Sequence, residues 1–148
     1  MTLMDPDDHY PLFIFAAPES TPTVWGLSYD RAEESLRTVD PEARIERGDM
    51  ALGSDELFWY QVTFPFGWAE GNAGVRHNWL SIMDASIETA AHFAAWLRKN
   101  LVPAGAGIEF NFTDGIEEGA APGTLPDSDD VEALKAALEE HVRGVIDG

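Results

Sequence analysis

The histidines are the first candidates in this chain for acid–base or metal chemistry. There are four of them, His9, His77, His92 and His141. Histidine is the side chain whose charge changes most readily near neutral pH. Because the spacings His-x-x-x-His and His-x-Glu do not occur, the sequence predicts no zinc site. His77 is the strongest candidate, since it lies beside aromatic residues on an expected strand, and Asp84 or Glu109 could be its carboxylate partner.

Nucleophiles and phosphate-binding loops are equally scarce. The chain has no cysteine, which removes thiolate nucleophiles, disulfides and thiolate metal sites together. No serine lies in a Gly-x-Ser-x-Gly motif. Gly67, Gly71 and Gly74 match neither Gly-x-Gly-x-x-Gly nor a P-loop. We therefore expect that the chain is not an enzyme and that it uses no cofactor and no metal.

The charge of the chain is strongly unbalanced. Its 148 residues include 27 acidic and nine basic side chains, for a net charge of −18. This excludes binding to nucleic acids or anionic membranes, because both need a basic face. The acidic candidates for partner binding follow the last expected strand, and they are Asp114, Glu117, Glu118, Asp127, Asp129 and Asp130. Helix capping is the competing interpretation for Asp127–Asp130.

Tryptophan is the second unusual feature. The chain has five tryptophans, which is more than the centre of so small a core can hold. Residues 65–74 are rich in glycine and are expected to form the enlarged tip of a hairpin. Trp68 lies in this segment and is expected to be exposed, the alternative being that it folds back as a lid on the sheet. Exposed tryptophans are typical of protein-binding hot spots.

Together the charge and the aromatics predict an acidic module that binds a basic protein partner. The most concrete form is an inhibitor or immunity-type protein that neutralises its partner, for example a toxin, since a negative field accelerates association with a basic surface. Two alternatives stay open. One is a small enzyme or ligand-binding protein with a pocket near His77, Asp84 and Glu109, and the other is a salt-adapted structural subunit. Homodimerisation is undecided.

The hydrophobic pattern predicts an α+β fold with a mostly antiparallel sheet of about five strands and three helices. Two of the helices are long and amphipathic, and the helices pack on one face of the sheet. The expected strands are 12–16, 43–50, 57–64, 75–83 and 108–112, with a shorter extended piece at 23–27. The expected helices are 30–39, 86–101 and a third from a cap at Asp127 or Ser128 to about residue 146.

These elements are expected to form a single domain over residues 1–148. Residues 1–10 are expected to be a frayed arm and residues 113–128 a long acidic loop. The N-terminal segment lacks the basic and apolar regions of a signal peptide. No apolar stretch approaches the roughly 20 residues of a membrane span, so we expect a cytoplasmic protein.

Overall fold

The computed structural model describes residues 8–48 and 57–148. Within these residues the fold is α+β, with a seven-stranded antiparallel sheet and four helices. The elements in chain order are β1 (His9–Ala16), α1 (Tyr29–Val39), β2 (Arg44–Gly48), β3 (Leu57–Phe64), β4 (Gly67–Gly74), β5 (Trp79–Ser86), α2 (Ile87–Asn100), β6 (Glu109–Phe112), α3 (Thr113–Glu117), β7 (Gly123–Thr124) and α4 (Val131–Asp147).

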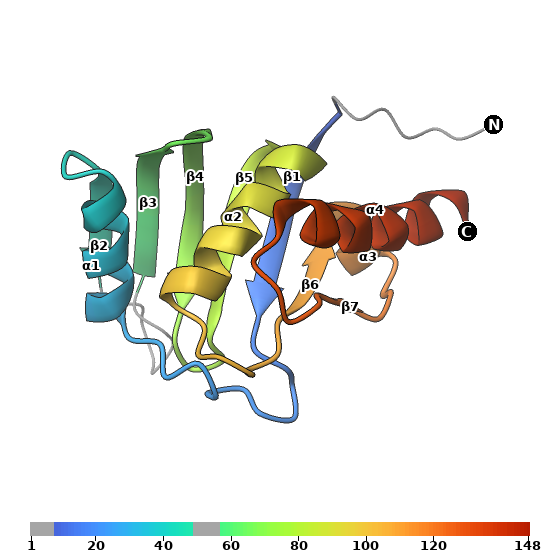
Figure 1. Ribbon diagram of the computed structural model, residues 1–148, viewed down its shortest axis with the longest axis horizontal. Helices are drawn as coiled ribbons and strands as arrows, with labels where there is room; N and C mark the ends of the chain where they lie inside the picture. The colour runs from blue at the N-terminus through green and yellow to red at the C-terminus, as the bar shows by residue number, and fades with distance from the viewer. Residues whose placement is uncertain (1–7, 49–56) are drawn as a thin grey trace.

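The first strand lies inside the sheet. The strand order is β2-β3-β4-β5-β1-β6-β7 (Figure 1). β1 pairs with β5 from His9 opposite Ser86 to Ala16 opposite Trp79, and on its other side it pairs with β6. An interior position suits the continuous apolar run at residues 12–16. His9 and Tyr10 belong to this strand, so the expected frayed arm is wrong for them, and residues 1–7 lie outside the described residues.

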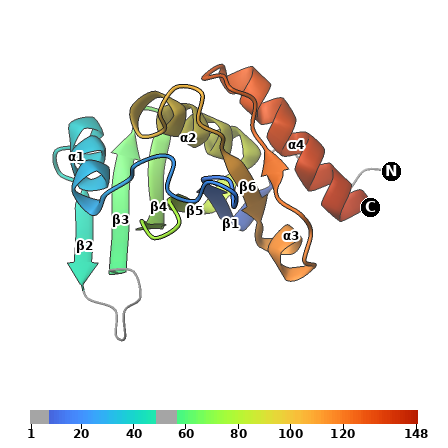
Figure 2. The same ribbon diagram turned by 90° about the horizontal axis from the view of Figure 1, so that it is seen from below.

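Helices α1, α2 and α4 lie on one side of the sheet (Figure 2). The core between these layers is aromatic and aliphatic. Phe13 and Phe15 of β1, Tyr60 of β3, Phe93 of α2 and Leu138 of α4 are all fully buried there. The three helices that correspond to the predicted ones lie on this side, whereas the additional helix α3 lies at the β6 edge (Figure 2). None of the helices within the described residues is long and apolar enough to cross a bilayer.

Side-chain caps set where the helices begin. Ser28 Oγ accepts a hydrogen bond from the backbone N–H of Arg31, and Ser86 Oγ accepts one from the backbone N–H of Thr89. The third predicted helix begins later than expected, because Asp130 is its cap. Ser128 Oγ accepts instead from the N–H of Asp130, which places Ser128 in the turn before α4.

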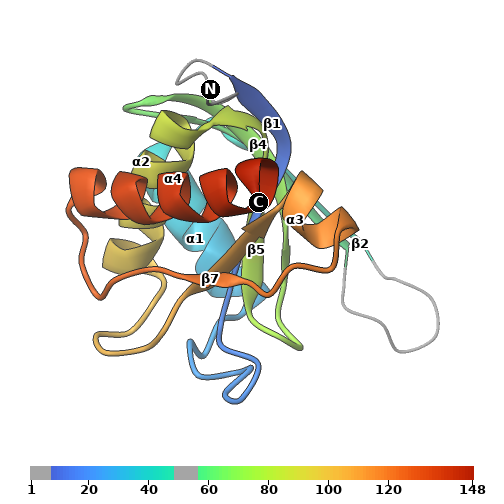
Figure 3. The same ribbon diagram turned by 90° about the vertical axis from the view of Figure 1, so that its right-hand side faces the viewer.

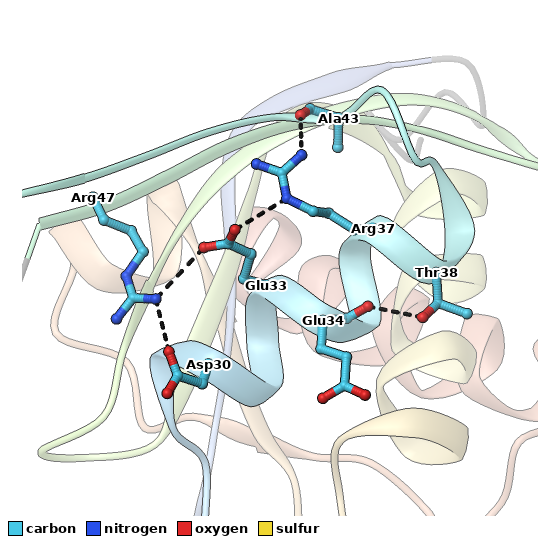
Figure 4. Close-up of polar contacts among 7 residues, drawn as sticks. All are labelled: Asp30, Glu33, Glu34, Arg37, Thr38, Ala43 and Arg47. Atoms are coloured by element: carbon cyan, nitrogen blue, oxygen red, sulfur yellow. Dashed lines mark hydrogen bonds and ion pairs between the residues drawn. The ribbon is translucent and has the colours of Figure 1, made fainter.

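A cluster of charged side chains holds α1 against β2 (Figure 4). Arg47 Nη1 lies 2.9 Å from Asp30 Oδ1 and 3.5 Å from Glu33 Oε1. Arg37 Nε lies 3.0 Å from Glu33 Oε2, and its Nη1 donates to the carbonyl oxygen of Ala43 at 2.9 Å. Two of the nine basic side chains are therefore committed to the helical side of the sheet.

The expected connection at 65–74 is wrong, because Gly67–Gly74 is strand β4. Its glycines permit close approach. Gly71 lies opposite Tyr60, whose hydroxyl reaches past β4 and donates to the carbonyl oxygen of Ser81 at 2.6 Å. A Cβ on Gly71 would collide with that carbonyl. Gly71 therefore makes room for the buried Tyr60 and does not mark a flexible loop.

The expected long loop at 113–128 also contains regular structure. It begins with the short helix α3 and later forms β7. Two hydrogen bonds join this segment to β6 and to Ile108, the residue before it. Asn111 Nδ2 donates to the carbonyl oxygen of Ala120 at 3.1 Å, and the N–H of Leu125 donates to the carbonyl oxygen of Ile108 at 2.9 Å. These are contacts between distant residues, which local propensity does not report.

The expected extended piece at 23–27 is wrong, since residues 23–25 form turns and no strand includes residues 26 and 27. Trp25 is buried in the core, and its Nε1 donates to the carbonyl oxygen of Gly107 at 2.9 Å. The strand expected at 75–83 begins at Trp79. Before it, the buried amide of Asn78 donates to Val75 and accepts from the N–H of Leu27, which ties the two turns together.

Candidate functional site

The side of the sheet opposite the helices carries the candidate site. Side chains alternate between faces along each strand, and the strand registers therefore define an open face. Its members are Arg44, Glu46, Leu57, Trp59, Gln61, Thr63, Trp68, Glu70, Asn72, Trp79, Ser81, Met83, Leu12, Ile14, Ala16, Glu109 and Asn111. Figures 2 and 3 show α1, α2 and α4 on the other side, with α3 at the β6 edge.

Large apolar side chains on the open face remain in contact with water. Trp68 is 56% exposed, Leu57 47% and Met83 39%. Trp68 and Met83 belong to the neighbouring strands β4 and β5. Leu57 lies six residues along β3 from Thr63, the residue opposite Trp68, which is about 20 Å at ~3.3 Å per residue. The exposed apolar side chains are therefore spread over the face. A folded domain seldom leaves several large apolar side chains exposed on one face, and such a face is typical of an interaction site.

Two further tryptophans of this face are held in place by their neighbours. Trp59 Nε1 donates to Glu70 Oε2 at 2.9 Å, and the guanidinium carbon of Arg44 lies 5.5 Å from the centre of its ring. Trp79 lies against Gly74 so closely that a Cβ at that glycine would collide with the indole. Rigid aromatic side chains lose little entropy when a partner covers them, which favours binding.

A cavity of about 240 Å³ lies at the β1–β6 end of the open face. Ile14, Ala16, Glu109 and Asn111 contribute to it from the strands. Its other lining residues are Ala17, Glu19, His77, Phe110 and Pro122. Two of the three residues predicted for a pocket, His77 and Glu109, therefore line the same cavity.

The ring of His77 is oriented by the backbone. Its Nε2 lies 2.7 Å from the carbonyl oxygen of Ala17. A carbonyl only accepts, so Nε2 carries the proton, and in the neutral ring Nδ1 is then an acceptor. Asp84, the third predicted pocket residue, does not line this cavity. It lies near the end of β5, where its carboxylate is 3.3 Å from His9 Nδ1.

A second cavity, of about 410 Å³, lies between α4 and the β6–β7 edge. His141 lines it and contacts the Asn111 side chain, with Nε2 3.0 Å from Oδ1. Because Asn111 Nδ2 donates elsewhere, His141 Nε2 is the donor to Oδ1. Burial lowers the pKa of His141. His141 was not among the predicted site residues, and its place beside the apolar stripe of the last helix was the one available signal.

The acidic residues predicted for partner binding lie in two separate places. Asp114, Glu117 and Glu118 are exposed at α3, on the β6 edge of the sheet (Figure 2). The other group precedes α4 in the helical layer. There Asp127 lies 3.6 Å from Arg98 Nη1, and Asp130 caps the helix. All three of Asp127, Asp129 and Asp130 are exposed, and structural contacts account for Asp127 and Asp130.

Among residues 8–48 and 57–148, no three histidine, aspartate or glutamate side chains are grouped so that they could hold a metal ion. Comparisons of the chain with protein-family models, with curated proteins and with solved structures gave no match.

Proposed function

We propose that this protein binds and neutralises a basic protein partner through the open face, as an inhibitor or immunity-type protein does. The observation that carries the proposal is the exposure of Trp68, Leu57 and Met83 on a sheet face that also fixes Trp59 and Trp79. Exposed aromatic side chains supply most of the binding energy in many protein interfaces.

The dimensions of the open face suit such an interface. Six neighbouring strands, from β2 to β6, span about 29 Å at ~4.8 Å per strand. Four of these strands have eight residues each, but β2 has five and β6 has four. At about 3.3 Å per residue the six strands cover about 650 Å², which approaches the ~800 Å² that each partner contributes to a standard interface.

The charge of the face favours a basic partner. By register, Glu46, Glu70 and Glu109 lie on it, and Arg44 is the one basic residue among its members. Arg37 and Arg47 are engaged by α1 on the other side (Figure 4). A homodimer would bring together two chains that each carry a net charge of −18, so electrostatic repulsion disfavours it.

The same observations weigh on the alternatives. Adaptation to salt gives no reason for exposed tryptophan, leucine and methionine on one face. The cavity with His77 and Glu109 supports a small-ligand-binding protein or enzyme as the second candidate. A cytoplasmic location remains part of the proposal, supported by the cysteine-free composition.

Affinity capture from the native lysate tests the proposal. Three immobilised forms would be compared: the wild type, the double variant Trp68→Ala/Met83→Ala, and the control Val24→Ala. Val24 is 43% exposed but lies in the turns after β1 and not on the open face. We expect the wild type and the control to retain the same basic protein in moderate salt, and the double variant to lose it.

Two results would contradict the proposal. Equal capture by all three forms would mean that the open face is not the binding surface. Capture of an acidic protein would mean that the negative charge does not select the partner.

A further inference from the structure

The cavity at the β1–β6 end of the open face is rich in hydrogen-bond acceptors. Glu19 and Glu109 contribute carboxylates, which only accept, and His77 contributes Nδ1 as an acceptor in its neutral form. The side-chain donors among the lining residues point elsewhere, since His77 Nε2 donates to Ala17 and Asn111 Nδ2 to Ala120. These side chains therefore favour a group that brings donors and positive charge.

The rest of the lining is apolar and comes from both strands and loops. Ile14, Ala16, Ala17, Phe110 and Pro122 complete the walls. A guanidinium suits this combination, because it is planar, carries five donors at its edge and is more weakly hydrated than an ammonium. The volume of about 240 Å³ lies below the 300–1,000 Å³ typical of drug-sized ligands, which favours a single side chain.

The cavity is continuous with the proposed docking surface. Ala16 in its lining pairs with Trp79 on one side and with Glu109 on the other. A partner that covers Trp79 therefore passes directly over the mouth of the cavity. Arginine and tryptophan are the residue types most enriched in hot spots, and arginine also supplies the charge that the face lacks.

We propose that this cavity receives one arginine side chain of the basic partner, with Glu109 and Glu19 accepting from the guanidinium and His77 bordering it. The inference rests on the proposed function for the origin of the arginine. The selectivity of the cavity for a guanidinium follows from the lining residues alone, and it can be measured without a partner.

The test is an NMR titration of the ¹⁵N-labelled full chain with N-acetyl-arginine amide. The matched ligands are N-acetyl-lysine amide, with the same charge, and N-acetyl-citrulline amide, with nearly the same shape and no charge. We expect saturable shifts of the Ala16, Ala17 and Glu109 amides, with a Kd on the order of millimolar for so small a ligand. Lysine amide should bind at least about fivefold more weakly, and citrulline amide should cause no saturable shift.

Matched variants identify the carboxylates responsible. Glu109→Gln should weaken binding of the arginine amide about tenfold or more, as expected for loss of a charge-assisted hydrogen bond. Glu19 lies at an exposed loop position, so Glu19→Gln tests the loss of a cavity carboxylate if the Glu109 variant does not fold. Glu132→Gln, on the exposed surface of α4, is the control and should bind as the wild type does.

Three results would overturn the inference: no saturable shifts in the wild type, equal affinity for lysine amide, or shifts that neither cavity variant changes. Its failure is distinct from failure of the proposed function. If a basic partner is captured through the open face but the arginine amide does not bind, the inference alone is wrong. If the amide binds as expected but no basic protein is captured, the selectivity of the cavity stands and the proposed function is wrong.

Discussion

Replacing Trp68 by alanine is the most direct test of the open face. The exposed fraction of this side chain is 56%, the largest among the large apolar residues that the structure describes. With about 250 Å² for a whole tryptophan, complete coverage would remove about 140 Å² from water. At ~25 cal/mol/Å² this corresponds to about 3.5 kcal/mol. Since coverage at an interface is incomplete, we expect a loss of about 2–3 kcal/mol, which is about a 30- to 150-fold weaker complex.

The assay is surface plasmon resonance with the captured basic partner. The dissociation rate should rise about 30- to 150-fold, whereas the association rate should stay within about threefold because the charge is unchanged. Val24→Ala, which truncates an exposed side chain away from the open face, should leave both rates within about twofold. Urea unfolding shows whether each variant is folded.

A folded Trp68→Ala variant that dissociates at the wild-type rate would show that Trp68 does not contribute to the stability of the complex. In that case Trp68 stays exposed in the complex, and the partner binds another part of the surface.

Three further predictions concern the electrostatics and the fold. Reversing the charge of Glu117 and Glu118 on the β6 edge should lower the association rate with the partner and flatten the dependence of that rate on salt. Reversing the charge of Asp129 in the helical layer should have a smaller effect. Equal effects on the association rate, measured by stopped-flow mixing, would contradict the proposed docking side. Gly71→Ala should lower the free energy of unfolding by about 2–5 kcal/mol, because its Cβ would collide with the Ser81 carbonyl and disturb the Tyr60 hydrogen bond. Gly48→Ala, with open space around a Cβ, should cost less than about 1 kcal/mol in the same urea titration. His141→Gln should reduce the loss of folding stability at acidic pH. Burial lowers the pKa of His141 in the folded state. The stability that the neutral ring contributes is therefore complete above the pKa of the unfolded chain, about 6.5, and is lost as pH falls through the folded pKa. Parallel acid unfolding curves for wild type and variant would contradict that role.

Strand β4 shows why part of the fold could not be predicted from the sequence. Three glycines within eight residues read as a loop, because glycine weakens an isolated strand. In the folded protein Gly71 and Gly74 are required by their neighbours, the Tyr60–Ser81 hydrogen bond and the Trp79 indole. Trp68 was expected to be exposed at a hairpin tip. It is exposed on a strand, so the expectation of exposure was right although its structural reason was wrong.

The candidate site was predictable only in fragments. His77 was predicted with Asp84 or Glu109 as its carboxylate partner, and the structure places His77 and Glu109 in one cavity. Asp84, the other predicted partner of His77, is only seven residues away in the sequence, but β5 runs between them and carries Asp84 to its far end, beside His9. Along an extended strand each residue adds about 3.3 Å. Residues several positions apart on one strand are therefore too far from one another for their side chains to be in contact.

By itself, the sequence determined the features that depend on local periodicity and composition. These are the α+β class, the strand at Leu57–Phe64, the helix that begins after Ser86, and the acidic charge that favours a basic partner. Only the tertiary structure decided which residues share a surface. The open face exists because β1 inserts between β5 and β6 and because three helices pack on the same side. Strand order and register are set by contacts between residues far apart in the chain, and periodicity within a strand carries no record of its neighbours.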